Sequence, residues 1–320
     1  MIPEKFRRGK YAGNKWGGKF LRAPDIFFTI LEKGKDKLVE LGRVVDVKFG
    51  IKTGVNEFFY IDEEVQKKWK IEKNFLKPVI KSPRECASII INLKNLKYNL
   101  FMCHKSKSEL KGTIALKYIE WGEKQKTKGG VLWSKVPSVS GRSRWYDLGE
   151  YKKECFLWPR VHNDSHRIYE CHIYAADTFS LLYPKYNYEI TGAILNSTLL
   201  WFCKELYGRK VLGEGGLSSL GVDLIKIETL NPKKLKKNDK LIKYFQKMKI
   251  REIGNIFEEL GLDPSKPIRE QEPKPLPDRA ELDKIIFDEL GLTEEERKEV
   301  YWAVAELVKQ RLEKARSLRR

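Results

Sequence analysis

The fold prediction starts from residues 188–207, YEITGAILNSTLLWFCKELY. Apolar side chains recur there at the spacing of one helical face, which predicts an amphipathic helix with a buried stripe. Gly208 follows directly, and glycine is common just past the end of a helix. We therefore expect one long helix in this stretch. The stripe comprises Leu195, Leu199, Phe202 and Leu206.

The segments outside this helix favour β-strands. In Arg43–Phe49 apolar and polar residues alternate, which is typical of a half-buried strand. The glycine-bearing segment GIKTGVN joins this run to Phe58–Ile61, so Val44–Ile61 is predicted to form a β-hairpin with a long loop. A further helix is expected over Pro24–Leu38. The other predicted strands are Ser88–Asn92, Leu100–Cys103, Cys155–Val161, Cys171–Ala175 and Asp223–Leu230.

The C-terminal part changes to lysine-rich helices and then to a proline-rich stretch. The predicted fold class is therefore α+β, with a mixed or antiparallel sheet, packed helices and an all-helical C-terminal tail. The last helix is predicted to begin at Thr293, where Glu296 completes a capping box. Its apolar stripe, from Val300 to Val308, either docks a protein partner or packs on its own domain. The predicted segments are a basic arm or connector (1–20), a recognition domain (21–235), a helical extension (236–261), a proline-rich linker (262–278) and a helical tail (279–320).

The charge of the chain predicts its partner. The formal net charge is +19 at pH 7, and the pI is about 9.5. From Arg279 onward ten basic residues balance ten acidic ones, so the whole surplus lies in residues 1–278. A field of this sign attracts polyanions, which favours double-stranded DNA over a generic basic surface. The charged fraction of 33% is typical of heat-adapted proteins, which favours a thermophilic prokaryote as the source.

Composition also narrows the class of protein. No run of about 20 apolar residues is present, so neither a membrane span nor a membrane partner is expected. The start, MIPEKFRRGK, lacks the apolar core of a secretory signal. Five widely spaced cysteines favour reduced thiols and a cytoplasmic location.

Two clusters of reactive residues have competing explanations. The spacing of the residues His162, His166, Cys171 and His172 would allow zinc, but a buried Cys171 with a surface or DNA-facing histidine pair is the preferred interpretation. Glu120, Glu123 and Lys124 could form part of a nuclease site, although carboxylates are frequent in so charged a chain. We therefore expect neither a metal site nor a catalytic residue.

Basic residues interleaved with aromatic ones are the main binding signal. In SVSGRSRWYDLGE (138–150), Arg142 and Arg144 stand beside Trp145 and Tyr146. An extended strand would place the two arginines and Tyr146 on one face and Trp145 in the core; the alternative is that both aromatic residues belong to the core. Arginines can bind phosphates or read guanine edges. Further candidate DNA contacts are Arg160, Arg167, Arg209 and Lys210.

Several segments, in order, resemble the TaqI-type specificity domain of adenine-N6 DNA methyltransferases in restriction-modification systems. They are LRAPDIFFTILEKGKDKLVELGRVVDVKFGIKTGVNEFFYID, KPVIKSPRE, YIEWGE, GRSRWYDLGE, ILNSTLLWF and LGEGGLSSLGVDLIKIETL, over roughly residues 15–232. The resemblance implies sequence-specific DNA recognition beside a catalytic domain that flips the target adenine. It also implies that Lys52, Thr53 and Asn56 lie towards DNA, as do Arg142, Arg144, Trp145 and Tyr146. A hairpin turn would favour Gly54 and Asn56 for structural reasons as well, whereas Asn196-Ser197 and Gly213–Gly216 are expected to serve packing.

The catalytic features of such methyltransferases are not found in the sequence. A glycine-turned loop for S-adenosylmethionine and a polar-Pro-Pro-aromatic tetrapeptide are missing, and Asn231-Pro232 is followed by lysines. We expect no cofactor in this chain, with S-adenosylmethionine bound by a separate catalytic domain or subunit. The alternatives are a nuclease and an RNA-binding protein whose aromatic residues stack on single-stranded bases.

Overall fold

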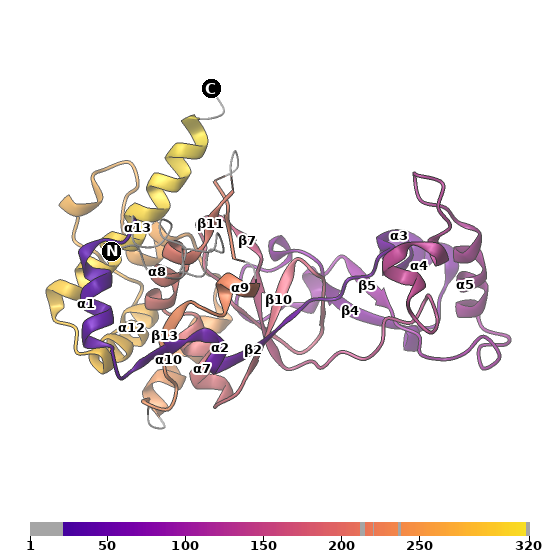
Figure 1. Cartoon of the computed structure of the whole chain (residues 1–320), viewed down its shortest axis with the longest axis horizontal. Coiled ribbons are helices and arrows are strands. Elements are labelled where there is room, and N and C mark those ends of the chain that lie inside the picture. The colour runs from indigo at the N-terminus through magenta and orange to yellow at the C-terminus, as the bar shows by residue number, and fades with distance from the viewer. Residues whose placement is uncertain (1–21, 212–214, 220, 236–237, 318–320) are drawn as a thin grey trace, which may run out of the picture.

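The computed structural model describes residues 22–211, 215–219, 221–235 and 238–317, and the predicted arm at 1–20 lies outside them. The molecule is elongated, with a larger lobe that contains both described ends and a smaller lobe beyond it (Figure 1). Most of the smaller lobe comes from the chain between Phe49 and Cys155, but Ile89 within this stretch packs in the core of the larger lobe, and Tyr174–Ala175 adds a strand to the sheet of the smaller lobe. The smaller lobe is therefore largely an insertion into the larger one.

An antiparallel sheet with the order β2-β10-β6-β8 lies in the larger lobe, on the side that faces the smaller lobe (Figure 1). Successive residues of β6 point to opposite faces: Phe156 and Trp158 pack on the helices, while Leu157 packs on the other side. Both faces of the sheet are thus covered, which explains the continuous apolar run CFLW. The strands are β2 (Val45–Phe49), β10 (Phe179–Pro184), β6 (Cys155–Pro159) and β8 (Tyr169–Cys171).

The predicted hairpin over Val44–Ile61 is wrong. Strand β2 pairs with β10, whereas β3 (Tyr60–Ile61) pairs with β5 (Tyr98–Phe101) in the other lobe. The connecting segment crosses from one lobe to the other instead of turning back. Alternation identified the strands correctly, but it carries no information about which strands pair.

The predicted long helix is two helices, α7 (Tyr188–Leu195) and α8 (Thr198–Tyr207). Between them Asn196 accepts a hydrogen bond from the backbone N–H of Ile168 (3.0 Å) and donates to its carbonyl (3.1 Å). The hydroxyl of Ser197 then caps α8 by accepting from the N–H of Leu200 (3.2 Å). The Asn196-Ser197 pair is therefore structural, as expected, and the apolar stripe of α8 is buried.

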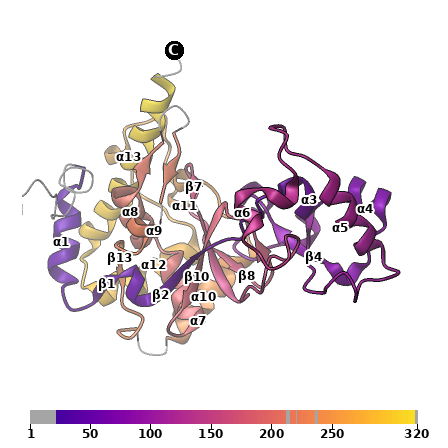
Figure 2. The same cartoon turned by 45° about the vertical axis from the view of Figure 1, so that its right-hand side comes forward.

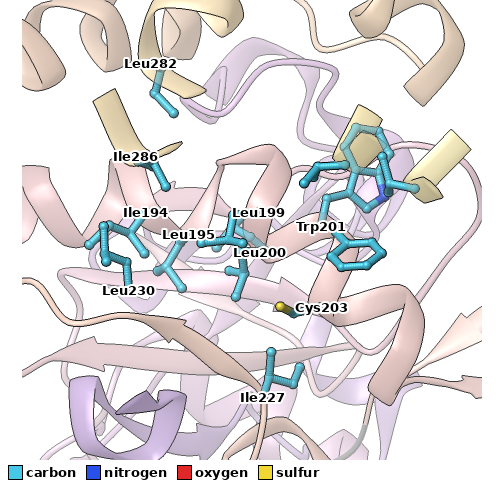
Figure 3. Close-up of a cluster of buried hydrophobic side chains, with 14 of the residues drawn as sticks. Ile194, Leu195, Leu199, Leu200, Trp201, Cys203, Ile227, Leu230, Leu282 and Ile286 are labelled. Carbon is cyan, nitrogen blue, oxygen red and sulfur yellow. The ribbon is translucent and has the colours of Figure 1, made fainter. Parts of the chain in front are cut away.

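The C-terminal helices share one core with the rest of the larger lobe. Figure 3 shows Leu282 and Ile286 of α12 in one cluster with Ile194 of α7 and Leu199 of α8, and the stripe from Val300 to Val308 is buried in the same cluster. The predicted extension, linker and tail therefore do not form separate units. The helices are α1 (Asp25–Lys33), α10 (Asp239–Ile250), α11 (Ile256–Leu260), α12 (Pro277–Leu290) and α13 (Glu294–Ser317).

The proline-rich stretch is also part of the core. Ile268 is buried there, and the indole of Trp302 in α13 donates to the carbonyl of Gln271 (2.8 Å). The predicted capping box of α13 is confirmed, because Thr293 and Glu296 exchange backbone-to-side-chain hydrogen bonds.

The smaller lobe packs around aromatic side chains. Phe58 contacts the rings of Phe101, Tyr118, Trp133 and Trp145. Its sheet has the order β3-β5-β4-β9, in which the β4–β9 pair is parallel. The further elements are β4 (Leu76–Ile80), β9 (Tyr174–Ala175), α3 (Asn56–Phe59), α4 (Glu63–Trp69), α5 (Ile114–Lys124) and α6 (Pro137–Ser140).

Small elements complete the larger lobe. The remaining strands and helices are β1 (Leu38–Glu40), β13 (Glu228–Leu230), β7 (Val161–His162), β11 (Arg209–Lys210), β12 (Leu217–Ser218), α2 (Leu41–Val44) and α9 (Gly221–Leu224). Short 3-10 turns lie at Lys73–Phe75, Pro83–Glu85, Leu93–Asn95, Trp133–Lys135 and Ile268–Glu270. The α+β fold class is confirmed. Within the described ranges, no helix combines the length and apolar character needed to cross a membrane.

Candidate nucleic-acid interface

The loop of residues 52–56 is held tightly at the entrance to the smaller lobe. Thr53 is buried, and its hydroxyl donates to the side-chain oxygen of Asn56, the first residue of α3. Gly54 has a φ of +79°, and an added Cβ would lie 2.6 Å from atoms of Ser138 and Val139. Lys52 and Asn56 are exposed on this tight loop.

Arg142 joins this loop to the basic segment. Its Nη2 donates to the carbonyls of Lys52 (3.0 Å) and Thr53 (2.9 Å), while Nη1 donates to the carbonyl of Trp145 (3.3 Å). Its guanidinium also lies 5.4 Å from the ring centre of Phe59. Burial lowers the pKa of Arg142. One side chain thus connects two segments that are about 90 positions apart, and Figure 2 shows α6, which leads into the second, at the edge of the smaller lobe.

Arg144 is anchored differently. Its Nη2 donates to the carboxylate of Asp147 (2.9 Å) and to the carbonyl of His104 (2.8 Å). The ring of His104 also hydrogen-bonds Asp147 (2.7 Å). Burial raises the pKa of Asp147, but hydrogen bonds from the Gly149 N–H, Arg144 and His104 outweigh it and leave the pKa lowered. Arg144 is partly exposed, so its guanidinium is oriented but accessible. Sequence reasoning missed His104 and Asp147, although Asp three residues after Arg is an ion-pair spacing.

The two aromatic residues beside the arginines belong to the core. The predicted strand here is wrong, because residues 141–146 form turns and bends. Trp145 packs 4.4 Å from the ring centre of Phe58 and donates to Glu123 (3.2 Å). Tyr146 is 3% exposed and donates to the carbonyl of Lys105 (3.0 Å). Neither ring has a face free for a base, so we assign Tyr146 to the support of the loop.

A second basic group lies on the larger lobe. Arg160 donates to the carbonyl of Asp177 (3.0 Å), and its guanidinium lies 5.8 Å from the ring centre of Phe49. Arg209 forms an ion pair with Asp223 (2.6 Å), and Lys210 is exposed beside it. These residues come together because β11 pairs with β12, which in turn pairs with β7 directly after Arg160.

Arg167 belongs to neither group. Its Nη1 donates to the carbonyls of Ala87 (3.3 Å) and Ile253 (3.2 Å). It thereby joins three segments of the larger lobe, so its observed contacts are structural.

The histidines considered for zinc do not converge. His162 and His166 are buried, which corrects the expected surface or DNA-facing pair: His162 lies beside Glu205, and His166 lies beside Lys204. His172 is exposed next to Glu170. The described part of the chain contains no group of three His, Cys, Asp or Glu side chains able to hold a metal ion.

The prediction that Cys171 is buried is confirmed. All five cysteines are buried and are free thiols. On α5, Glu123 is bound by Lys107 (2.6 Å) and by the indole of Trp145, so this carboxylate, one of the two considered for a nuclease, serves the fold.

Comparisons relate the chain to the C-terminal domain of a type II methyltransferase. The family model of the C-terminal domain of the type II methyltransferase M.Eco57I matches residues 13–258. The type IIG restriction endonuclease BpuSI is similar in structure, with a TM-score of 0.63 and 12% identity over 91% of this chain and 34% of that chain. The type IIL restriction-modification enzyme MmeI, solved in complex with DNA, gives a TM-score of 0.49 and 12% identity over 86% of this chain and 36% of that one.

The chain spans about a third of the length of either solved structure. No curated protein sequence matches it. At 12% identity the likeness to BpuSI shows the fold alone, whereas the family match covers most of the chain. The resemblance is thus confirmed as far as a type II methyltransferase C-terminal domain, and its TaqI-type subdivision stays a prediction. The chain belongs to the family of the C-terminal domain of the type II methyltransferase M.Eco57I.

Proposed function

We propose that the chain reads a specific sequence of duplex DNA as the TaqI-type target-recognition part of an adenine-N6 DNA methyltransferase in a restriction-modification system. The observation that carries the proposal is the clamp by Arg142, which holds the loop 52–56 against the segment that bears Arg144. A protein that distinguishes bases needs polar side chains fixed on a rigid support. The hydrogen bonds of Arg142 provide such a support, and the two segments that they join carry the basic side chains of Lys52 and Arg144.

The contacts of each side chain suggest a division of roles. Arg142 uses three of its donors on backbone carbonyls, so it positions the loop. Asn56 is exposed and neutral, and an asparagine can recognise adenine through two hydrogen bonds. Arg144 is fixed through Nη2, so Nη1 is placed to contact a guanine edge.

The remaining cations fit the DNA backbone. The ammonium of Lys52 has no hydrogen-bond or ion-pair partner among the residues that the structure describes, and it suits a phosphate. Arg160, Arg209 and Lys210 form the matching group on the larger lobe. With the buried aromatic residues unable to stack on single-stranded bases, this arrangement favours a duplex over single-stranded RNA.

Methyl transfer is assigned to a catalytic part outside these 320 residues, which binds S-adenosylmethionine and receives the target adenine. Because the sequence lacks the cofactor loop and the adenine-binding tetrapeptide, this chain supplies recognition only. The family to which it belongs supports this division of labour.

The test is a selection of bound duplexes from a randomised pool, followed by affinity measurements on the selected sequence. Arg142→Ala should weaken binding about tenfold or more, and Arg142→Lys should not restore it because an ammonium lacks the guanidinium fork. Asn56→Ala should relax selectivity at one base pair. Lys67→Ala, which removes an exposed cation of α4 in the same lobe, is the matched control. Failure to select any sequence, or unchanged binding by all variants, would overturn the proposal.

A further inference from the structure

Phe49 is an exposed aromatic residue on the larger lobe. Its side chain is 63% exposed at the end of β2, and the exposed Val222 (66%) lies close by. Gly221, the residue before Val222, lies next to the ring, because a Cβ added to Gly221 would be 3.9 Å from Phe49. Scattered apolar residues are ordinary on a surface, but a large ring grouped with a neighbouring valine points to a binding surface.

The backbone around Phe49 is fixed. Phe49 pairs with Ser180 of β10, and the N–H of Gly50 donates to the carbonyl of Phe179 (3.0 Å). The N–H of Ile51 donates to the carbonyl of Ala175 (2.8 Å). An added Cβ on Gly50 would meet the carbonyl oxygen of Ala176, so the chain is pressed against its neighbour. The backbone that carries the ring is therefore rigid, and it does not belong to a loop that could turn the ring towards the core.

The surroundings of the ring are cationic. Arg160 lies over Phe49 at 5.8 Å, and Arg209 is positioned next to Val222 by its ion pair with Asp223. Lys52 follows three residues later, so at most about 11 Å of chain separates it from Phe49. Phe49 is thus the last residue of β2, next to Arg160 of the larger lobe and three residues before Lys52 of the smaller lobe. A flat apolar ring between cations matches a duplex, whose phosphates flank flat bases.

We infer that Phe49 is a wedge that inserts between two base pairs of the bound duplex and unstacks them. The inference rests on the proposed function, since it requires DNA to lie across both basic groups. Arg160, which lies over the ring, and Arg209, beside Val222, hold the phosphates on either side of the opened step, while the fixed backbone resists displacement. Apolar side chains in this position unstack and kink DNA in other proteins.

The experiment uses the full chain and selected duplexes that carry 2-aminopurine at successive positions, because this base fluoresces when it is unstacked. Binding should raise the fluorescence at one step. Phe49→Ala should abolish the rise and weaken binding about five- to a hundredfold, Phe49→Leu should keep part of it, and Phe49→Trp should retain it. Phe28→Ala, which removes another exposed phenylalanine of the larger lobe, is the matched control.

The outcomes separate the two proposals. If the wild-type chain binds selected duplexes but Phe49→Ala preserves both affinity and the fluorescence rise, the wedge is overturned and the proposed function stands. If Phe49→Ala instead weakens only the association with a methyltransferase catalytic domain, the surface docks protein and the wedge is again overturned. If the wild-type chain binds no duplex, the proposed function itself fails.

Discussion

Arg311 and Glu205 form a buried, two-pronged ion pair that joins α13 to α8. Nε and Nη2 of the arginine donate to the two carboxylate oxygens at 3.0 and 2.8 Å, and both side chains are about 1% exposed. Arg311 also donates to the carbonyls of Asn163 and Gly215. The last helix is therefore attached to the layer beneath the second basic group, so it supports the surface that carries Arg209.

Arg311→Met should destabilise the larger lobe strongly, because it leaves Glu205 buried without its partner. Loss of one member of a buried ion pair costs about 3–5 kcal/mol. Urea unfolding followed by circular dichroism measures the change, and Arg316→Met, an exposed position on the same helix, is the control. Equal unfolding midpoints for the two variants would contradict a structural role for the pair.

Acid should destabilise the protein through His162. Burial and then Lys204 lower the pKa of His162 to about 3, although Glu205 acts in the opposite direction. The unfolded chain takes up this proton near pH 6.5, while the folded chain does not until about pH 3. Stability should therefore fall as pH decreases through this window, by about 1.4 kcal/mol per pH unit for one proton.

His166 adds to the same effect, because burial and Lys204 also hold its pKa well below the usual value. Urea unfolding at pH 7.5, 6.5 and 5.5 should show a declining free energy of unfolding, and His162→Gln should reduce the decline. His172→Gln, at an exposed position, should leave it unchanged. A free energy that is constant between pH 7.5 and 5.5 would show that neither buried histidine is kept neutral.

Much of the fold could be predicted because local patterns report local structure. The apolar stripe of α8, the strand β6 and the capping box at Thr293 all follow from spacing. The break at Asn196 could not be predicted, since it depends on hydrogen bonds to Ile168, which is 28 positions away. The insertion was missed for the same reason: pairing of β2 with β10 is decided by the core, and not by the residues of β2.

The sequence selected the two segments of the candidate site but did not reveal the hydrogen bonds that join them. The family resemblance selected both Lys52–Asn56 and Arg142–Tyr146, which the structure brings into contact. It could not show that the guanidinium of Arg142 turns inward and donates hydrogen bonds to backbone carbonyls of the loop 52–56. The alternation that buries Val45 would also bury Phe49, and the structure exposes that ring instead.

Gly54→Ala should weaken DNA binding by displacing the loop 52–56. Its φ of +79° disfavours a side chain, and the new methyl group would meet Ser138 and Val139 at 2.6 Å. Gly112→Ala is the matched control, because Gly112 has a φ of +81° with nothing within 4 Å of its added Cβ. Both variants share the backbone strain, so a difference in their affinity isolates the contact. Equal affinities would show that the packing of this loop does not matter for DNA binding.

The salt dependence of binding should separate phosphate contacts from base contacts. Each neutralised phosphate of duplex DNA contributes about −0.9 to the slope of log affinity against log salt concentration. Lys52→Ala and Lys210→Ala should each make the slope shallower by about 0.9, the contribution of one phosphate contact. Both residues are exposed cations of the basic groups. Asn56→Ala should lower the affinity for the selected sequence with an unchanged slope, because its side chain is neutral. Lys67→Ala should alter neither quantity, since its ammonium is paired with Glu63 on α4. A slope reduced as much by Lys67→Ala as by Lys52→Ala would mean that net charge alone attracts DNA, and the assignment of the two basic groups would then be wrong.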